Sequence, residues 1–257
     1  MVSTNIVLTE TVRDRSQRSV GDQVALITGA SRGIGAATAL VLAKRGFRVV
    51  VNHLASAQEG EAVVAAIREA GGEAVAIRAD VTAPGDVAAM FDETNQRWGR
   101  VDVLVHNALI PFDVTSFADL SWEQLGGKLD RELRAAFLIT KAVVPGMISR
   151  HYGRLVYLSS GLSRRPRDGM IALGTAKAAL DQFVRFIALE LAPHGITANL
   201  VAPATVAGET RFAVIPCGAS SSAIGTSWSS AAFAVPRLIM PLRGRRDSPV
   251  LIYTSRP

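Results

Sequence analysis

The sequence holds a single cysteine, Cys217, so no disulfide can form within the chain. No cluster of Cys and His has the spacing of a zinc site, which argues against a bound metal. The first twenty residues lack the continuous apolar stretch of a secretion signal, and no later run is long and apolar enough to span a bilayer. We therefore predict a cytoplasmic protein that folds by packing alone and has no membrane partner.

Basic residues outnumber acidic ones, and the net charge of +6 raises the question of nucleic-acid binding. The excess is unevenly placed, because six arginines and one acid lie from Arg211 onward. Removing these seven from the totals of 28 basic and 22 acidic residues leaves 22 and 21 in the rest of the chain. The body of the protein is nearly neutral, so we expect no nucleic-acid partner.

Short runs of β-branched residues alternate with longer alanine-rich segments, a pattern typical of repeated strand-helix units and a parallel sheet. Strands are predicted at Val24–Thr28, Arg48–Asn52, Ala74–Ala79, Val101–Asn107, Gly153–Ser159 and Thr197–Ala202. Helices are predicted at Ile34–Arg45, Gln58–Ala70, Pro84–Trp98, Leu120–Arg150 and Ile171–Ala192. The predicted fold class is α/β, with a single Rossmann-type doubly wound parallel sheet and helices on both faces.

The chain divides into an N-terminal extension at 1–20, a dinucleotide-binding oxidoreductase domain at 21–210 and an atypical tail at 211–257. The tail is rich in Ser, Arg and Pro, almost without acids, and lacks the apolar periodicity of a docked helix. Two origins stay open for it: a divergent tail, or translation of a shifted reading frame. We expect an irregular segment whose removal near Thr210 does not lower stability.

A glycine-rich stretch, TGASRGIG, lies directly between the first predicted strand and the first predicted helix. Glycines let the chain turn sharply and bring backbone N–H groups close to an anion, and the helix N-terminus adds about half a positive charge. This context predicts a pyrophosphate site, although an ordinary strand-to-helix turn is the alternative. The candidate residues are Thr28, Gly29, Ser31, Arg32, Gly33, Ile34 and Gly35.

This stretch resembles the cofactor motif of the short-chain dehydrogenase/reductase family, and the likeness runs from about Asp22 to Pro203. The chain is similar to the 3-oxoacyl-acyl-carrier-protein reductase-like members of that family. Asp80 and Val81 follow the third strand, where the resemblance implies contact with the adenine; a helix N-cap is the alternative for Asp80. The family's Asn-Asn-Ala-Gly motif stands here as His106-Asn107-Ala108-Leu109. Asn107 and Ala108 remain cofactor candidates, whereas Leu109 would crowd the ribose or demand a changed backbone angle.

The second predicted strand ends in VVVNHLAS, with no acid to bind a free ribose 2′-OH. Asn52, His53 and Ser56 leave room for a 2′-phosphate, and Arg32 supplies a compensating charge unless it merely faces solvent. We therefore predict that NADP(H) is preferred over NAD(H).

The family carries a Ser, a Tyr thirteen residues later and a Lys four further on, and the resemblance assigns these positions to Ser160, Leu173 and Lys177. The tyrosine that protonates the substrate carbonyl is therefore replaced by leucine. The family's lysine also holds the cofactor ribose, so the resemblance makes Lys177 a cofactor candidate as well. The family's Asn on the preceding helix falls on Glu132, five residues before Phe137. A carboxylate there would pair with the ammonium of Lys177, unless Glu132 is a solvated acid beside Arg131 and Lys128.

No nearby hydroxyl replaces the tyrosine. Tyr157 lies three residues before Ser160 on the same strand, so its side chain points to the opposite face of the sheet. Thr175 lies about 200° around the helix from Leu173. Losing a general acid typically costs a factor of roughly 10² to 10⁴ in rate, so diminished activity is expected rather than none.

Beyond the sixth strand, Pro203 and Thr205 stand where the family contacts the nicotinamide. Three arginines, Arg164, Arg165 and Arg167, follow Ser160 and either make the substrate entrance positive or are solvated. The resemblance also implies a homodimer or homotetramer.

Two functions stay open. One is an NADP(H)-dependent oxidoreductase that reduces a small carbonyl substrate, a ketone or a 3-oxoacyl thioester, with reduced or unorthodox activity. The other is a catalytically impaired NADP(H)-binding protein with a regulatory or vestigial role. Leu173 is the residue that separates them.

Overall fold

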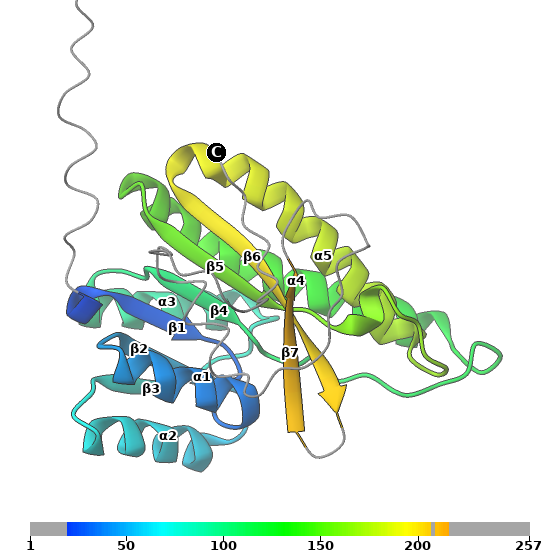
Figure 1. Ribbon diagram of the computed structural model, residues 1–257, viewed down its shortest axis with the longest axis horizontal. Coiled ribbons are helices and arrows are strands. Elements are labelled where there is room, and N and C mark those ends of the chain that lie inside the picture. The colour runs from blue at the N-terminus through cyan, green and yellow to red at the C-terminus, as the bar shows by residue number, and fades with distance from the viewer. Residues whose placement is uncertain (1–19, 207–208, 216–257) are drawn as a thin grey trace, which may run out of the picture.

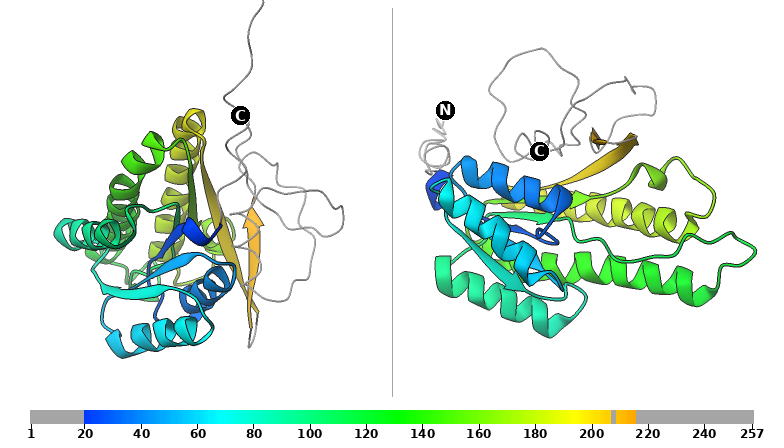
Figure 2. Two further views of the ribbon diagram at one scale, coloured as in Figure 1. Left: turned by 90° about the vertical axis from the view of Figure 1, so that its left-hand side faces the viewer. Right: turned by 90° about the horizontal axis from the view of Figure 1, so that it is seen from below.

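The computed structural model describes residues 20–206 and 209–215, and the side chains of residues 21–203. They form one sheet of seven strands in the order β3-β2-β1-β4-β5-β6-β7, with helices on both faces (Figures 1 and 2). The strands are β1 (Val24–Ile27), β2 (Arg48–His53), β3 (Ala74–Arg78), β4 (Val103–His106), β5 (Gly153–Leu158), β6 (Ile196–Val206) and β7 (Glu209–Ile215). The long helices are α1 (Gly33–Lys44), α2 (Ala57–Glu69), α3 (Pro84–Trp98), α4 (Trp122–Ser149) and α5 (Ile171–Leu191).

The predicted α/β fold is confirmed, because β1 to β6 are parallel and each predicted strand and helix is present with shifts of a few residues at its ends. Successive strand residues point to opposite faces. In β1, Ala25 and Ile27 belong to the hydrophobic core between the sheet and helices α1 and α2. Val24 and Leu26 belong to the core on the other face, between the sheet and helices α3, α4 and α5. Burial on both faces explains why the strands read as continuous apolar runs.

The strand order reverses between β1 and β4, which are hydrogen-bonded neighbours although β2 and β3 separate them in sequence. Connections from β1 and β4 then leave toward opposite faces of the sheet, and a crevice opens beyond their carboxyl ends. The glycine-rich turn and the segment after His106 meet at this crevice.

Helix α4 begins at Trp122, where Ser121 and Gln124 form a reciprocal capping box. These bonds satisfy backbone and side-chain groups at the helix start and fix its first residue two positions later than the sequence predicted. The fixed start sets which side of α4 faces the interior, and both Lys128 and Glu132 lie on that side. None of the helices in the described ranges is long and apolar enough to cross a membrane.

Strand β7 differs from the sequence prediction. It pairs antiparallel with β6 from Val206 opposite Glu209 to Leu200 opposite Ile215, so it crosses the boundary predicted at residue 210. The segment ETRFAVI is three polar residues followed by four apolar ones, without the alternation of a half-buried strand, which explains why it went unrecognised. A chain ending near Thr210 would lose most of this ladder, and the effect of that truncation on stability stays a prediction. Residues 216–257, and with them most of the predicted tail, lie outside the described part of the chain.

Candidate active site

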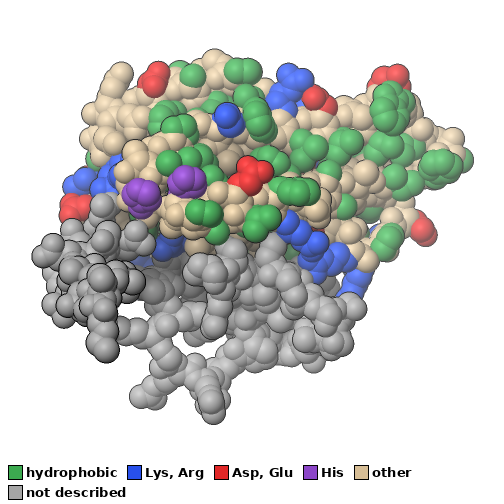
Figure 3. All heavy atoms as spheres, turned by 90° about the horizontal axis from the view of Figure 1, so that it is seen from above, with side chains coloured by type: hydrophobic (Ala, Val, Ile, Leu, Met, Phe, Trp, Pro, Cys, Tyr) green, Lys and Arg blue, Asp and Glu red, His purple; other side chains and the backbone are tan. Residues whose placement is uncertain are grey.

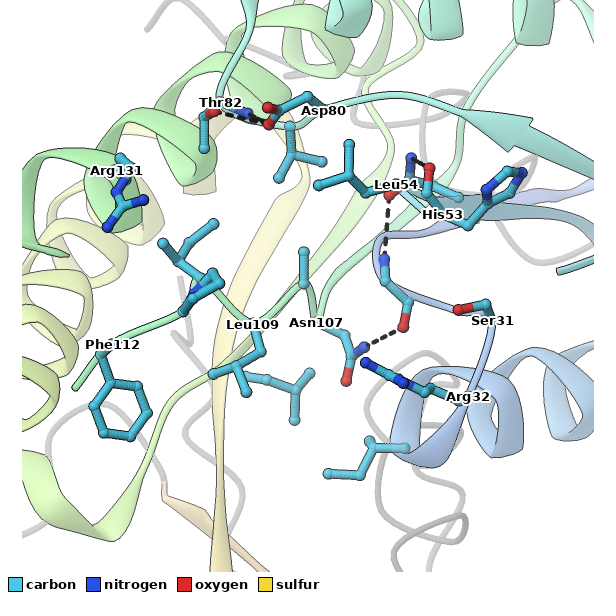
Figure 4. Close-up of a pocket in the computed structure, with 18 of the residues that line it drawn as sticks. Ser31, Arg32, His53, Leu54, Asp80, Thr82, Asn107, Leu109, Phe112 and Arg131 are labelled. Atoms are coloured by element: carbon cyan, nitrogen blue, oxygen red, sulfur yellow. Dashed lines mark hydrogen bonds between the residues drawn. The ribbon is translucent and has the colours of Figure 1, made fainter. Parts of the chain in front are cut away.

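A cavity of about 890 Å³ lies in the crevice at the carboxyl ends of β1, β2, β4 and β5 (Figure 4). It runs from the glycine-rich turn, past the ends of β2 and β3, to the end of β5 and the start of α5. In Figure 4, Ser31 and Arg32 lie at one side of it and Arg131 and Phe112 at the other. Most of the cofactor residues predicted from the sequence therefore lie around one space, together with Ser160, Leu173 and Lys177.

The glycine-rich turn fits a phosphate group. Gly29 and Gly33 have φ of +60° and +57°, a backbone region that favours glycine. A Cβ on Gly35 would lie 2.4 Å from the carbonyl oxygen of Gly29, so only glycine lets α1 approach the turn this closely. A Cβ on Gly33 would meet nothing within 4 Å, which leaves open space above the turn. Arg32, the N-cap of α1, makes no side-chain cap, so the first N–H groups of α1 stay available to an anion.

Thr28 joins the turn to the segment after β4. Its Oγ1 accepts hydrogen bonds from the backbone N–H of Asn107 and of Ala108, both at 3.0 Å. The Asn107 amide in turn donates to the carbonyls of Thr28 at 3.0 Å and Gly29 at 2.9 Å. Asn107 and Thr28 therefore hold the two sides of the crevice together and fix the shape of the cavity at this end.

Asn52 lines the cavity, but its amide is held by the backbone of neighbouring strands. Its Oδ1 accepts a hydrogen bond from the N–H of Gly29 at 3.1 Å, and its Nδ2 donates to the carbonyl of Ala79 at 3.0 Å. The buried amide therefore ties the ends of β1, β2 and β3 together instead of presenting its polar atoms to a 2′-phosphate. Arg32, which is exposed, and Ser56 remain at that end of the cavity.

Asp80 shapes the turn after β3. Its Oδ1 accepts hydrogen bonds from the N–H and the hydroxyl of Thr82, at 2.8 and 2.7 Å. The alternative that Asp80 caps α3 is wrong, since the N-cap is Ala83 and its side chain makes no cap. Val81 is buried beside Ile110 and Ala135 and lines the same part of the cavity.

Ser160, Leu173 and Lys177 come together at the far end of the cavity. Ser160 follows β5, and its Oγ accepts a hydrogen bond from the N–H of Leu162 at 3.2 Å. Leu173 is 8% exposed and faces the same space from the first turn of α5. Leu173, which the sequence comparison predicts to replace the family's tyrosine, therefore lines the cavity, and its alkyl side chain carries no proton to donate.

Lys177 and Glu132 form an ion pair inside the protein. Nζ of Lys177 lies 2.6 Å from Oε1 of Glu132 and donates to the carbonyl of Leu158 at 2.6 Å. Glu132 is fully buried, so the alternative of a solvated acid is wrong. Burial works to raise the pKa of Glu132, but the charge of Lys177 and the hydrogen bond from Lys128 outweigh it and hold that pKa below its ordinary value.

Lys128 belongs to the site, although the sequence analysis named it only as a neighbour of Glu132. It is 1% exposed, and its Nζ donates to Oε2 of Glu132 at 2.5 Å and to the carbonyl of Ile110 at 2.7 Å. The signal was present, because a Lys four residues before a Glu lies one helical turn away on the same face. The apolar residues that flank the pair, Ala135, Ala136 and Ile139, showed that this face is buried.

The predictions for Tyr157 and Thr175 are confirmed, and one of the two expectations for Leu109 is not. Tyr157 is fully buried against Thr140 and burial raises the pKa of its hydroxyl, so it is core, as predicted. Thr175 is exposed and faces away from the cavity, also as predicted. Leu109 lines the cavity while 68% exposed, and it needs no glycine-like angle, since His151 is the one non-glycine residue at positive φ in the described ranges.

The arginines after Ser160, which are Arg164, Arg165 and Arg167, are exposed and do not line the cavity. Pro203 lines it, whereas the side chain of Thr205 lies outside the described part of the chain. No group of three His, Cys, Asp or Glu residues able to hold a metal occurs within that part.

The sequence profile described as short chain dehydrogenase matches residues 23–214. The chain belongs to the short-chain dehydrogenase/reductase family. It is 42% identical over 185 residues to a 3-oxoacyl-acyl-carrier-protein reductase from Synechocystis sp., which covers 72% of this chain and 74% of that protein. This family is one of oxidoreductases that bind a nicotinamide cofactor.

Two solved structures with different cofactors are similar to this chain. A metagenomic short-chain oxidoreductase in complex with NADP matches with a TM-score of 0.67 and 33% identity, over 72% of this chain and 83% of that one. A xylitol dehydrogenase bound to NAD⁺ matches with a TM-score of 0.68 and 32% identity, over 72% of this chain and 71% of that one. Similarity of fold therefore does not decide between the two cofactors.

Proposed function

We propose that this protein is an NADP(H)-dependent reductase of a ketone or a 3-oxoacyl thioester. The observation that carries the proposal is that one cavity joins the uncapped N-terminus of α1 to Ser160 and Lys177. A dinucleotide with its pyrophosphate on that helix would extend toward the two polar side chains, where the reacting carbonyl must lie.

The choice of NADP(H) rests on charge at the end of β2. The carboxylate of Asp80 is the one acid among the cavity residues that the structure describes, and it lies after β3 rather than β2. Arg32 is exposed at the turn, where its guanidinium is free to reach a 2′-phosphate. An adenine ribose with a free 2′-OH would find no carboxylate after β2.

The substrate class follows from the residues that face the reacting end. The Ser160 hydroxyl can donate to a carbonyl oxygen, and the ammonium of Lys177 supplies positive charge beside it. The bound cofactor supplies the hydride that reduces the carbonyl. The similar protein from Synechocystis sp. is named for a 3-oxoacyl substrate, which favours an acyl thioester among the carbonyl compounds.

Subunit association and location belong to the same proposal. Phe137 on α4 and Phe186 and Leu189 on α5 are 50%, 57% and 73% exposed. Apolar side chains are also spread among charged ones over the face seen in Figure 3. Such side chains support a homodimer or homotetramer, which sedimentation would measure. The single cysteine fits a reducing cytoplasm.

The test is NADPH oxidation by the purified protein against a panel of ketones and 3-oxoacyl thioesters. Turnover with at least one of them supports the proposal. NADPH binding without turnover of any of them supports the second candidate, a protein that holds NADP(H) without reacting. Leu173 is the observation that favours this second candidate, because the position of the proton donor holds an alkyl side chain.

A further inference from the structure

Two of the chain's four lysines contact one buried carboxylate. The sequence contains only Lys44, Lys128, Lys141 and Lys177. Lys128 binds Oε2 of Glu132 and Lys177 lies against Oε1, and all three side chains are at most 7% exposed. One carboxylate and two ammonium groups leave this cluster with a net charge of +1 inside the protein.

An uncompensated charge in the interior is costly, so its location matters. Lys128 has both of its contacts within the protein, and burial lowers the pKa of its ammonium. Lys177 is the member of the cluster that lines the cavity. The excess positive charge is therefore presented to the cavity at Lys177, next to Leu173 and Ser160.

The ammonium of Lys177 has a proton left for a ligand. It carries three protons: one goes to the carbonyl of Leu158, and Oε1 of Glu132 lies 2.6 Å from Nζ as an ion-pair partner. The other cationic side chain toward this end, Arg131, is a guanidinium that does not release its proton. Of these two cationic side chains, Lys177 is thus the one that can give up a proton to a group in the cavity.

We propose that Lys177 itself donates the proton that the family's tyrosine would supply, with Lys128 as a positioning residue that keeps Glu132 from neutralising it. This inference rests on the proposed reductase function. As hydride arrives at the carbonyl carbon, the C=O π pair moves onto oxygen. The N–H bond of Lys177 breaks and an O–H bond forms, which leaves a neutral amine and an alcohol. The amine then regains a proton from water at the cavity mouth.

Lys128 matters because, without it, Glu132 and Lys177 would form a neutral ion pair. In such a pair Glu132 would hold the proton on Lys177 more tightly. Lys128 occupies Oε2 and adds a positive charge behind the carboxylate, which favours release of the proton toward the substrate oxygen.

The experiment compares Lys177→Arg, Lys177→Met and Lys128→Met with Lys141→Met, a control at an exposed lysine on α4. Each variant is characterised by its unfolding temperature, its NADPH Kd by calorimetry and its kcat in H₂O and D₂O. Lys177→Arg keeps the charge but holds its proton, so it should bind NADPH like the parent and lose about 10² or more in kcat. Lys128→Met should lose about tenfold in kcat, keep its NADPH Kd and show a larger solvent isotope effect.

A second measurement needs no cofactor. Carbon-13 at the lysine ε-carbons gives four resonances, and Lys128→Met should displace that of Lys177, whereas Lys141→Met should not. Three results would overturn this inference while leaving the proposed function intact. They are full kcat in Lys177→Arg, an unchanged solvent isotope effect in Lys128→Met, or a Lys177 resonance that does not move in Lys128→Met. A parent protein that binds NADPH but reduces no substrate would overturn the proposed function as well.

Discussion

Nζ of Lys177 on α5 lies 2.6 Å from Oε1 of Glu132 on α4, in an ion pair that joins the two longest helices inside the protein. Lys128 contacts the other oxygen of the same carboxylate, so Glu132 is the counter-ion that two ammonium groups share. Removing the carboxylate would leave both cations buried without a counter-charge, which is the costly way to break a buried pair.

We expect Glu132→Gln to lower the free energy of unfolding by about 3–5 kcal/mol. Adding Lys128→Met to Glu132→Gln removes one of the two stranded charges and should restore most of that loss. Urea unfolding of these two variants and the parent measures this. Glu190→Gln, at an exposed acid on α5, is the control and should change stability by less than about 0.5 kcal/mol. A double variant less stable than Glu132→Gln would show that Lys128 stabilises the fold by packing rather than through its charge.

His106 is neutral in the folded protein. The hydroxyl of Thr28 already accepts two backbone hydrogen bonds, so its own proton is directed to Nδ1 of His106, 3.3 Å away. The ring is 2% exposed, and burial together with the charge of Lys177 lowers its pKa from 6.5 to about 4.

Between pH 6.5 and 4 the unfolded chain gains a proton at this residue and the folded protein does not. Stability should therefore fall with falling pH, by about 3 kcal/mol over this window. His106→Asn should remove that dependence, as measured by urea unfolding at pH 7, 5.5 and 4.5. His151→Asn, at an exposed histidine, serves as the control. If the free energy of unfolding of His106→Asn depends on pH as strongly as that of the parent, groups other than His106 cause the dependence.

The sequence predicted the parallel sheet and the place of the glycine-rich turn because both depend on local signals. Apolar runs such as β1 and the glycines at 29, 33 and 35 can be read without knowing their neighbours. The role of Asn52 could not be read, because its partners, Gly29 and Ala79, come from other strands. Lys128 looked like a surface residue until Ile110 and Glu132 were placed around it.

Gly35 is required by the closeness of α1 to the turn. A Cβ there would lie 2.4 Å from the Gly29 carbonyl oxygen and 2.6 Å from the Asn107 amide, so Gly35→Ala must displace the turn. We expect a loss of about 1–3 kcal/mol in stability. We also expect NADPH affinity to fall at least tenfold. Gly85→Ala on α3, whose Cβ would meet nothing within 4 Å, should leave NADPH affinity unchanged. Equal NADPH affinities in the two variants would show that the turn tolerates displacement.

Arg32 is the residue on which the preference for NADPH over NADH should depend. It is exposed at the N-terminus of α1 and lines the cavity. A charge-assisted hydrogen bond to the 2′-phosphate is worth about 1.5–3 kcal/mol, so Arg32→Ala should weaken NADPH binding by about tenfold or more and leave NADH binding unchanged. Calorimetric titration of parent and variant with both cofactors measures this. Equal affinity of the parent for the two cofactors would contradict the prediction.

Leu173→Tyr should raise carbonyl reductase activity. Leu173 lines the cavity one helical turn before Lys177, so a phenol there would face the same space as Ser160 and Lys177. A phenol with an ordinary pKa near 10 becomes a useful acid near neutrality when a neighbouring cation stabilises its phenolate, and Lys177 is placed to do so. A new proton donor should raise kcat by on the order of 10² or more.

Two further variants show whether that gain comes from the phenol. Leu173→Phe fills the same space without a hydroxyl and should stay as slow as the parent. Lys177→Ala added to Leu173→Tyr should remove most of the gain, because the phenolate would lose its cation. If Leu173→Tyr folds, binds NADPH and gains nothing, the pocket has diverged at more than one residue. Leu109 at the cavity wall and Glu132 beneath Lys177 would then be the residues to change next, and NADP(H) binding without turnover would become the better proposal.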